Sequence, residues 1–536
     1  MNALTPPPDR QGYVALILHA HLPYMRHPED PHALELRWLY DGITECYLPL
    51  LEVLEHLGAD GVPFVLTLSV SPTLLNMLAD PLLRRRYEAH LDALIELADR
   101  EVARTAGDGE IHAVAQMYQH LLRRRRRQWR RLGGDLTGAL RDLAGAGRIE
   151  LLTCAATHGF LPLLAVRPEA VRAQVAVAVA EFRRFFGHPP AGFWLPECGY
   201  YPGLETVLAA EGVRYVVLET HGLTGARPAP SAGAYAPVWI GDGVAALGRD
   251  PETSRQVWSA REGYPGDYAY REYYRDVGFD LDLEYVRPYV HPDGHRVATG
   301  IKYFRITGPT DHKAIYDPGA AHQTAVRHAG HFVWCRERQV EYLAARLHRP
   351  PLIVAPYDAE LFGHWWFEGP VWLEHVARRA ACEQSVWGFT TPGAYLAAHP
   401  PVERVEPPLS SWGYGGYCDF WLSGPNHWVW RHLHHTSARM AELVRRHARA
   451  PRDALLHRAL RQAGREVLLA QASDWPFILR SGTQVEYARR RLHLHLGRFT
   501  RLYEDLTAGR RPDPDWLRQV EEEDACFPDL DPAVFA

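Results

Sequence analysis

Seven short apolar runs, each ending in a polar or ionisable cluster, limit what this chain can fold into. They lie at 13–18, 64–68, 149–152, 193–195, 213–218, 352–354 and 386–389. Short apolar runs separated by helix-like sequence are typical of buried parallel strands. Functional residues gathered after strand ends are typical of the mouth of a β/α barrel. The pattern therefore predicts an α/β fold with a seven-stranded, somewhat irregular (β/α)7 barrel, and a doubly wound open sheet is the alternative.

Two stretches interrupt this strand–helix rhythm. Residues 73–145 are charged and helix-rich, too long for one crossover, and predict a helical insertion. Residues 222–345 alternate Gly/Pro-rich sequence with aromatic segments and predict long active-site loops. Both would belong to a catalytic barrel spanning 11–400. A proline-rich linker follows, and amphipathic sequence then predicts a helical C-terminal domain over 410–536.

Composition excludes several classes of protein. The net charge of -5 gives no reason to expect a nucleic-acid partner. The seven cysteines are scattered and lack CxxC spacing, which argues against a disulfide framework or a structural zinc site. The polar, proline-rich N-terminus is unlike a signal peptide, and no apolar run nears the length of a membrane span. We therefore expect a cytoplasmic protein without a membrane partner; the oligomeric state is left open.

Three histidines follow predicted strands. His19 and His21 are two residues apart, which places them on the same side of an extended strand end, and His158 follows the third run. Spacing of the HxH type is common among metal ligands. The same side chains also serve as hydrogen-bond donors at the floor of a polar pocket, as hydroxyl-rich substrates require. The residues alone leave both interpretations open.

Two carboxylates follow buried strands in aromatic surroundings. Glu197 comes after Pro196, which stops the strand's hydrogen-bond ladder, and Asp358 precedes a histidine and paired tryptophans in PYDAELFGHWW. A structural glutamate and a helix-capping aspartate are the simpler interpretations. Glycoside cleavage, however, needs two carboxyl groups, one to attack the anomeric carbon and one to protonate the leaving oxygen. A barrel could bring these two strand ends face to face.

Eight motifs in order carry a family resemblance. They are HAHLPY (19–24), ATHG (156–159), GFWLPE (192–197), GRDPETSRQVWS (248–259), EGYPGD (262–267), PYDAELFGHWW (356–366), SSWGYGGY (410–417) and ASDWPF (472–477). This series resembles glycoside hydrolase family 57 and, within it, the 1,4-α-glucan branching enzymes of glycogen biosynthesis. The resemblance covers almost the whole chain, and it also implies a (β/α)7 barrel with a helical insertion and a helical C-terminal domain.

The resemblance implies a retaining, double-displacement mechanism without a metal or organic cofactor. Glu197 matches the nucleophile of the family, and Asp358 matches its general acid and base. The substrate would be an α-1,4-glucan such as amylose or a glycogen-like polymer. The residues expected to contact it are His19, His21, His158, Arg249, Trp258, Gly266, Trp365, Trp412, Asp474 and Gln484.

One segment departs from the family pattern. Branching enzymes of the family carry a loop tyrosine in a segment resembling KYGVYAPV, where this chain has SAGAYAPV (231–238). Ala232 therefore stands at the first tyrosine position, and Tyr235 matches the second. A bulky lid residue would favour a sugar acceptor over water, so its loss makes an α-amylase-like hydrolase the alternative activity. Two further alternatives are a metal-dependent hydrolase or deacetylase built on the three histidines and a non-catalytic glucan-binding protein.

Overall fold

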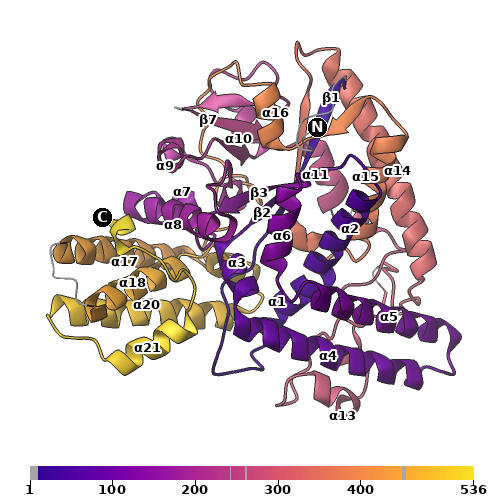
Figure 1. The fold of residues 1–536 in the computed structure, drawn as a ribbon, viewed down its shortest axis with the longest axis horizontal. Coiled ribbons are helices and arrows are strands. Elements are labelled where there is room, and N and C mark those ends of the chain that lie inside the picture. Colours follow the sequence, from indigo (N-terminus) through magenta and orange to yellow (C-terminus); the bar gives the residue numbers. More distant parts are fainter. Residues whose placement is uncertain (1–9, 242, 260–261, 309, 449–453) are drawn as a thin grey trace.

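A computed structural model describes residues 10–536 except 242, 260–261, 309 and 449–453, and it has a mixed α/β architecture (Figure 1). The strands are β1 (Gly12–Ala20), β2 (Leu66–Val70), β3 (Ile149–Cys154), β4 (Gly192–Trp194), β5 (Tyr215–Leu218), β6 (Val238–Ile240), β7 (Val244–Gly248), β8 (Leu352–Asp358) and β9 (Trp387–Phe389). All seven predicted apolar runs overlap strands. The predicted α/β class is confirmed.

The sheet is parallel except at one hairpin. Its strand order is β6-β7-β5-β4-β3-β2-β1-β8, β9 pairs with β1 beside this path, and only the β6–β7 pair is antiparallel among the described strands. An isolated parallel bridge joins Arg249, directly after β7, to Val354 of β8. The carboxyl end of β7 therefore meets the strand at the other end of the sheet order.

Both faces of the sheet are buried, which explains why its strands are apolar throughout rather than alternating. In β1, Ala15 and Ile17 belong to a cluster with side chains of β3, β4, β5, β7 and β8. The residues between them, Val14 and Leu16, face a second cluster that contains side chains of the surrounding helices. One face thus packs strand against strand, and the other packs strand against helix.

Helices surround the sheet. Before β2 and between β3 and β5 lie α1 (Leu36–Asp41), the π-helix η1 (Gly42–Tyr47), α2 (Leu48–Ala59), α7 (Leu161–Leu164), α8 (Pro168–Phe186) and α9 (Leu204–Ala210). After β8 come α15 (Gly369–Cys382) and α16 (Pro392–Ala398). The segment between β2 and β3 forms α3 (Pro72–Ala79), α4 (Pro81–Arg104), α5 (Gly109–Arg131) and α6 (Leu136–Gly145). Each of these last four begins at a Ser or Asp that caps it, namely Ser71, Asp80, Asp108 and Asp135.

The segment 222–345 contains more regular structure than loops alone. It includes the β6–β7 hairpin, the helices α11 (Pro251–Trp258), α12 (Val277–Asp280) and α13 (Leu283–Val286), and the 27-residue helix α14 (Pro318–Ala344). Helix α10 (Thr220–Thr224) begins just before it. The apolar stripe of α14 is interrupted by His, Arg and Gly, so the apolar periodicity of a helix is not recognisable in its sequence. The hairpin strands are too short to show alternation.

The described residues after 426 are mainly helical and gather at one side of the molecule (Figure 1). Its helices are α17 (His427–His447), α18 (Ala454–Ala470), α19 (Asp474–Ser481), α20 (Val485–Thr507) and α21 (Pro514–Glu523). Helix α18 packs against α17, α20 and α21. Within the described residues, no helix combines the length and apolarity needed to cross a bilayer. The polar segment before residue 10, on which the signal-peptide argument rests, lies outside them.

Candidate active site

The residues predicted to act together follow the carboxyl ends of neighbouring strands. His19 of β1 is directly paired with Asp358 of β8 on one side and with Ser69 of β2 on the other. His158 follows β3, and Glu197 follows β4. Because parallel strands end at the same edge of a sheet, these side chains meet at one edge.

The backbone at Glu197 is held in an uncommon conformation. Glu197 and the next residue, Cys198, both have positive φ angles, of 62° and 50°. Left-handed backbone is unfavourable for residues other than glycine and persists where the surroundings impose it. Here the amide of Trp412 donates to the Glu197 carbonyl oxygen over 2.8 Å. The turn after Pro196 therefore directs the carboxylate out of the strand.

Two side chains donate hydrogen bonds to the Glu197 carboxylate. Trp412 Nε1 lies 2.6 Å from Oε2, and Ser473 Oγ lies 3.2 Å from Oε1. Burial raises the pKa of Glu197 to about 8; the hydrogen bond from Trp412 opposes this shift, and the negative charges of Asp358 and Asp474 add to it. The carboxylates are thus close enough to influence each other's ionisation.

Asp358 lies at the end of β8 in a more basic environment. Burial raises its pKa to about 6, and the positive charges of Arg249 and His21 limit the rise. Arg249 is itself fixed by Glu219 at 2.8 Å and by Ser254 at 2.7 Å. The two catalytic candidates therefore have raised pKa values of different size.

A third buried carboxyl group, Glu360, was not predicted as a site residue. Its Oε1 accepts a hydrogen bond from Tyr47 at 2.6 Å and one from the amide of His21 at 3.2 Å. Burial raises the pKa of Glu360 to about 8, and the neighbouring charge of Asp358 contributes to that shift. The only sequence signal for Glu360 was its position two residues after Asp358. Through its hydrogen bond with the His21 amide, Glu360 connects the end of β8 to the backbone of the histidine pair.

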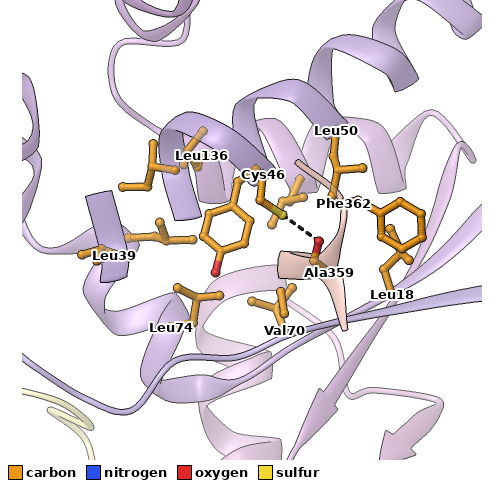
Figure 2. Packing of buried hydrophobic residues seen from close by; sticks show 14 of the residues in the cluster. Leu18, Leu39, Cys46, Leu50, Val70, Leu74, Leu136, Ala359 and Phe362 are labelled. Atoms are coloured by element: carbon orange, nitrogen blue, oxygen red, sulfur yellow. Dashed lines mark hydrogen bonds between the residues drawn. The ribbon is translucent and has the colours of Figure 1, made fainter. Parts of the chain in front are cut away.

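The turn that carries Asp358 is anchored in an apolar cluster beneath the site. Figure 2 shows Cys46 of the π-helix η1 among leucines, with its thiol directed at the turn after β8. Cys46 Sγ donates to the carbonyl oxygen of Ala359 over 2.9 Å. Tyr47, the next residue, holds Glu360. Helix η1 thus fixes the backbone on which two of the carboxyl groups stand.

The three predicted histidines lie together as a stack. The rings of His21 and His158 are 4.0 Å apart and nearly parallel, and those of His19 and His158 are 5.0 Å apart. Burial and the neighbouring imidazoles lower the pKa values of His19 and His158 well below the usual range. These two rings are therefore neutral at pH 7 and act as hydrogen-bonding groups.

Two of these histidines and a cysteine have the spacing of a possible metal site. His19, Cys154 and His158 offer three possible ligand atoms within 4.8 Å of one another. However, His19 Nε2 and His158 Nε2 form a hydrogen bond of 2.9 Å with each other. Their other ring nitrogens bind Ser69 at 3.0 Å and Ser473 at 2.8 Å. Since every ring nitrogen of this pair has a protein partner, the arrangement fits a hydrogen-bonded wall better than a metal centre.

The C-terminal helices contribute directly to the site. The carboxylate of Asp474, the first residue of α19, lies 3.1 Å from His21 Nε2, and its contact with substrate stays a prediction. The preceding Ser473 contacts both His158 and Glu197. A bridge between Gly159 and Ala472 ties this segment to the loop after β3. Ser473 was not predicted, because nothing local distinguishes it from a helix-capping serine.

Aromatic side chains and Arg249 border a pocket of about 410 Å³. Trp412 and Tyr417 line it together with Arg249, whose guanidinium lies 5.3 Å from the Trp412 ring centre. The Trp412 ring also contacts Trp194 at 5.4 Å and Trp258 at 6.4 Å. The pocket therefore begins beside the indole that holds Glu197.

Three predicted contact residues are not bonded to either catalytic candidate, although the amide of Trp365 donates to the carbonyl oxygen of Glu360 over 3.2 Å. Trp365 is 54% exposed and stacks on Tyr273 at 4.4 Å. Gly266 ends a short 3-10 helix after α11, and Gln484 is an exposed residue before α20. Across the described ranges, no hydrogen bond or ion pair links Trp365, Gly266 or Gln484 to Glu197 or Asp358. Their contact with substrate stays a prediction.

The segment with Ala232 and Tyr235 is attached to the start of β8 by its backbone and to the residues after β7 by a side chain. The Tyr235 carbonyl oxygen accepts a hydrogen bond from Leu352, the first residue of β8, whereas Asp358 is the last. The Tyr235 hydroxyl binds Asp250 at 3.2 Å. The Ala232 carbonyl oxygen accepts from the Tyr235 amide at 3.1 Å. Tyr235 thus lies beside the start of β8.

Two family models match the chain. The model described as "Glycosyl hydrolase family 57" matches residues 15–303, and that described as "1,4-alpha-glucan branching enzyme, C-terminal" matches residues 432–535. A curated relative from Thermococcus kodakarensis, the 1,4-alpha-glucan branching enzyme TK1436, is 34% identical over 96% of this chain and 77% of its own length.

Solved structures resemble the whole chain. The alpha-amylase AmyC from Thermotoga maritima is 41% identical, with a TM-score of 0.92 over 98% of this chain and 99% of that one. The structure of TK1436, described as a GH57 branching enzyme in complex with glucose, is 32% identical, with a TM-score of 0.87 over 98% and 96% of the two chains.

Proposed function

The chain belongs to glycosyl hydrolase family 57, and from that premise we propose that it is a retaining 1,4-α-glucan branching enzyme. It would cleave an α-1,4 link, keep one of the two fragments bound to the enzyme, and transfer that fragment to a C6 hydroxyl of another glucan. The observation that carries the proposal is the pairing of Glu197, held by two hydrogen-bond donors, with Asp358 at the same sheet edge. The names of the curated relatives support the branching outcome.

In the first step, Glu197 would be the nucleophile. Its carboxylate attacks the anomeric carbon as the bond to the glycosidic oxygen breaks, and Asp358 donates its proton to that oxygen. The product is a glycosyl ester on Glu197 and a released chain with a new hydroxyl group. The donors Trp412 and Ser473 support this role, since hydrogen bonds to a carboxylate stabilise its charged form.

In the second step, Asp358 would act as a base. It takes the proton of an acceptor's C6 hydroxyl, whose oxygen attacks the anomeric carbon and expels the Glu197 carboxylate. Two inversions at one carbon retain the α configuration. The acceptor decides the product, because a sugar hydroxyl gives a branch and water gives a free reducing end.

The raised pKa values imply that the pair shares one proton near neutral pH. In the unliganded site the higher pKa, about 8, belongs to Glu197, whereas the first step requires the proton on Asp358. Bound substrate would favour movement of the proton from Glu197 to Asp358. Only a protonated Asp358 can donate to the glycosidic oxygen, and the positive charge that develops on the sugar stabilises an ionised Glu197.

The surrounding side chains would bind the sugar at the cleavage point. His19, His21 and His158 form a wall of imidazoles next to Glu197, and Asp474 adds an acceptor. Trp412 and Trp258 offer aromatic faces for stacking, with Arg249 beside them. We extend the proposed contact surface to Gly266, Trp365 and Gln484, which would meet more distant glucose units.

We also propose a seven-stranded (β/α)7 barrel, with β7 in place of the predicted run at 386–389. Its strands would be β1 to β5 with β7 and β8, which the bridge from Arg249 to Val354 supports. The catalytic barrel would span 11–400 with α3 to α6 as its helical insertion. Residues 410–536 would form the helical C-terminal domain, whose Ser473 and Asp474 complete the site.

Hydrolysis is the second candidate outcome of the same chemistry. The Thermotoga maritima structure is described as an alpha-amylase, and Ala232 replaces the loop tyrosine expected of branching enzymes. Both outcomes share the glycosyl ester on Glu197, so they are separated by their products. Incubation with amylose, followed by counting of α-1,6 links and reducing ends, tests the proposal. Branches without a matching rise in reducing ends support it, and reducing ends without branches contradict it.

A further inference from the structure

A second open groove lies between two of the C-terminal helices. It has a volume of about 640 Å³, within the range of small-molecule sites. Helix α17 contributes Trp428 and His432, and α20 contributes His493, Gly497, Arg501 and Glu504. None of these residues belongs to the active site described above. Both helices are nevertheless part of the helical group that supplies Ser473 and Asp474 to that site.

Gly497 at the groove lacks a packing explanation. It lies in the interior of the 23-residue helix α20, where glycine is less favourable than alanine. A Cβ atom placed on Gly497 would meet no atom within 4 Å, so no neighbouring element requires the missing side chain. Glycine at such a position exposes helix backbone and permits close approach of a ligand.

Trp428 offers an aromatic face that is fixed before a ligand binds. Its Nε1 donates to the carbonyl oxygen of Pro425 over 3.2 Å. The rings of His432 and His493 lie 6.0 and 6.3 Å from it. A pyranose ring stacks its C–H face on such an indole, while imidazoles at the edge can reach its hydroxyl groups.

The opposite part of the groove is polar and carries both signs of charge. Arg501 is held against the ring of Trp516 at 3.8 Å, which orients its guanidinium. Glu504 supplies an acceptor one turn away. Mixed charge does not suit a phosphate or another anion, and the number of polar groups does not suit an apolar peptide. Donors and acceptors beside a fixed aromatic face suit a neutral polyhydroxyl chain.

We propose that this α17–α20 groove is a second binding site for an α-glucan chain, separate from the catalytic centre. The inference rests on the proposed function, because the ligand class is that of the proposed substrate. A polymer held in the groove stays attached while its other chains enter the active site. The groove therefore raises the effective concentration of long substrates and has no effect on short ones.

Affinity electrophoresis in gels containing amylose tests this binding. All variants carry Glu197→Gln, so that the polymer is not altered during the run. Trp428→Ala removes the stacking face, and Gly497→Gln fills the groove at a position where the helix accepts a side chain. Trp334→Ala is the matched control, because it removes an exposed tryptophan of α14. We expect the dissociation constant for amylose to rise at least about fivefold in both groove variants and to stay unchanged in the control.

Turnover separates this proposal from the catalytic one. With Glu197 intact, both groove variants should convert maltoheptaose at the wild-type rate within about twofold and should show a raised KM for long amylose. The proposal is overturned if neither groove variant weakens retention, or if Trp334→Ala weakens it equally. A wild-type protein inactive on every glucan would instead contradict the proposed function.

Discussion

Trp412 and Glu197, which are 215 positions apart in the chain, are joined twice. The indole Nε1 of Trp412 donates to the Glu197 carboxylate over 2.6 Å, and its backbone amide donates to the Glu197 carbonyl oxygen over 2.8 Å. The first bond favours the charged carboxylate, and the second holds the turn that presents it. One residue thus sets both the electrostatics and the position of the proposed nucleophile.

Replacing Trp412 by phenylalanine should lower kcat by about 10- to 100-fold, because a hydrogen bond to a charged group is lost. The pKa of Glu197 should rise further, since the indole opposes the effect of burial. Initial rates across pH give both quantities. Trp387→Phe is the control, because Trp387 of β9 lies outside the proposed site and its Nε1 is buried with no hydrogen-bond partner among the described residues. Equal losses in the two variants would contradict the role given to the Trp412 hydrogen bond.

The rate of glucan conversion should have a bell-shaped dependence on pH. The mechanism needs one ionised and one protonated carboxyl group. As the pH falls below about 6, the second carboxyl group takes up a proton and the nucleophile is lost. As the pH rises above about 8, the remaining proton leaves and the acid is lost. Initial rates on amylose between pH 4 and 10 would show this, and an activity that kept rising above about pH 9 would refute the shared proton.

Glu197→Gln should abolish turnover and stabilise the fold at high pH. The folded-state pKa of Glu197 is raised from 4.5 to about 8, so the fold is favoured while this group is protonated. That stability is fully present below about pH 4.5 and is lost as the pH rises through about 8. Glutamine cannot ionise, so the variant avoids this loss. Its free energy of unfolding at pH 9 should exceed that of the wild type by about 2 to 4 kcal/mol. Melting temperatures of the variant and the wild type at pH 5 and pH 9 test this prediction. It is wrong if the variant gains more stability over the wild type at pH 5 than at pH 9.

Ser473→Ala should slow catalysis without unfolding the protein. The hydroxyl of Ser473 contacts both Glu197 and His158, so its loss leaves the carboxylate and the imidazole without a shared partner. We expect kcat to fall about tenfold, which corresponds to one hydrogen bond. Ser481→Ala, on the same helix but bound only to its own turn and to Thr483, serves as control. An unchanged kcat in Ser473→Ala would remove this residue from the site.

Chelation should leave activity unchanged. The ring nitrogens of His19 and His158 bind each other and two serines, and the proposed steps need only the carboxyl pair. Activity is measured after dialysis against EDTA, with the metal content of the protein determined in parallel. Loss of activity that zinc restores would favour the metal-dependent hydrolase instead.

The strand ends could be predicted because a buried strand leaves a local apolar signature. Each predicted run overlaps a strand. His19 and Asp358 stand at the carboxyl ends of β1 and β8, and His158 and Glu197 come shortly after β3 and β4. Strand β7 was not predicted, because its sequence VAALG is short and consists mostly of residues with small side chains. The run at 386–389 was counted in its place, although β9 pairs with β1 beside the main strand order.

The cross-chain contacts could not be predicted from local patterns. Ser473 meets Glu197 across 276 positions, and no spacing rule connects a serine after α18 with a strand end. Glu360 was visible beside Asp358, but its burial depends on Tyr47 of η1. The motifs along the chain therefore identified candidate residues, and only the fold shows which of them share a site.

Trapping of the glycosyl-enzyme tests the central claim, that Glu197 forms the covalent intermediate. In the variant Asp358→Asn, α-maltosyl fluoride can still react, because fluoride leaves without a proton, and the missing base slows the second step. Peptide mass spectrometry then locates the sugar. The account predicts one maltosyl group on the peptide that contains Glu197 and none when Glu197→Gln is added. A maltosyl group on Glu360 or on any other residue would contradict it.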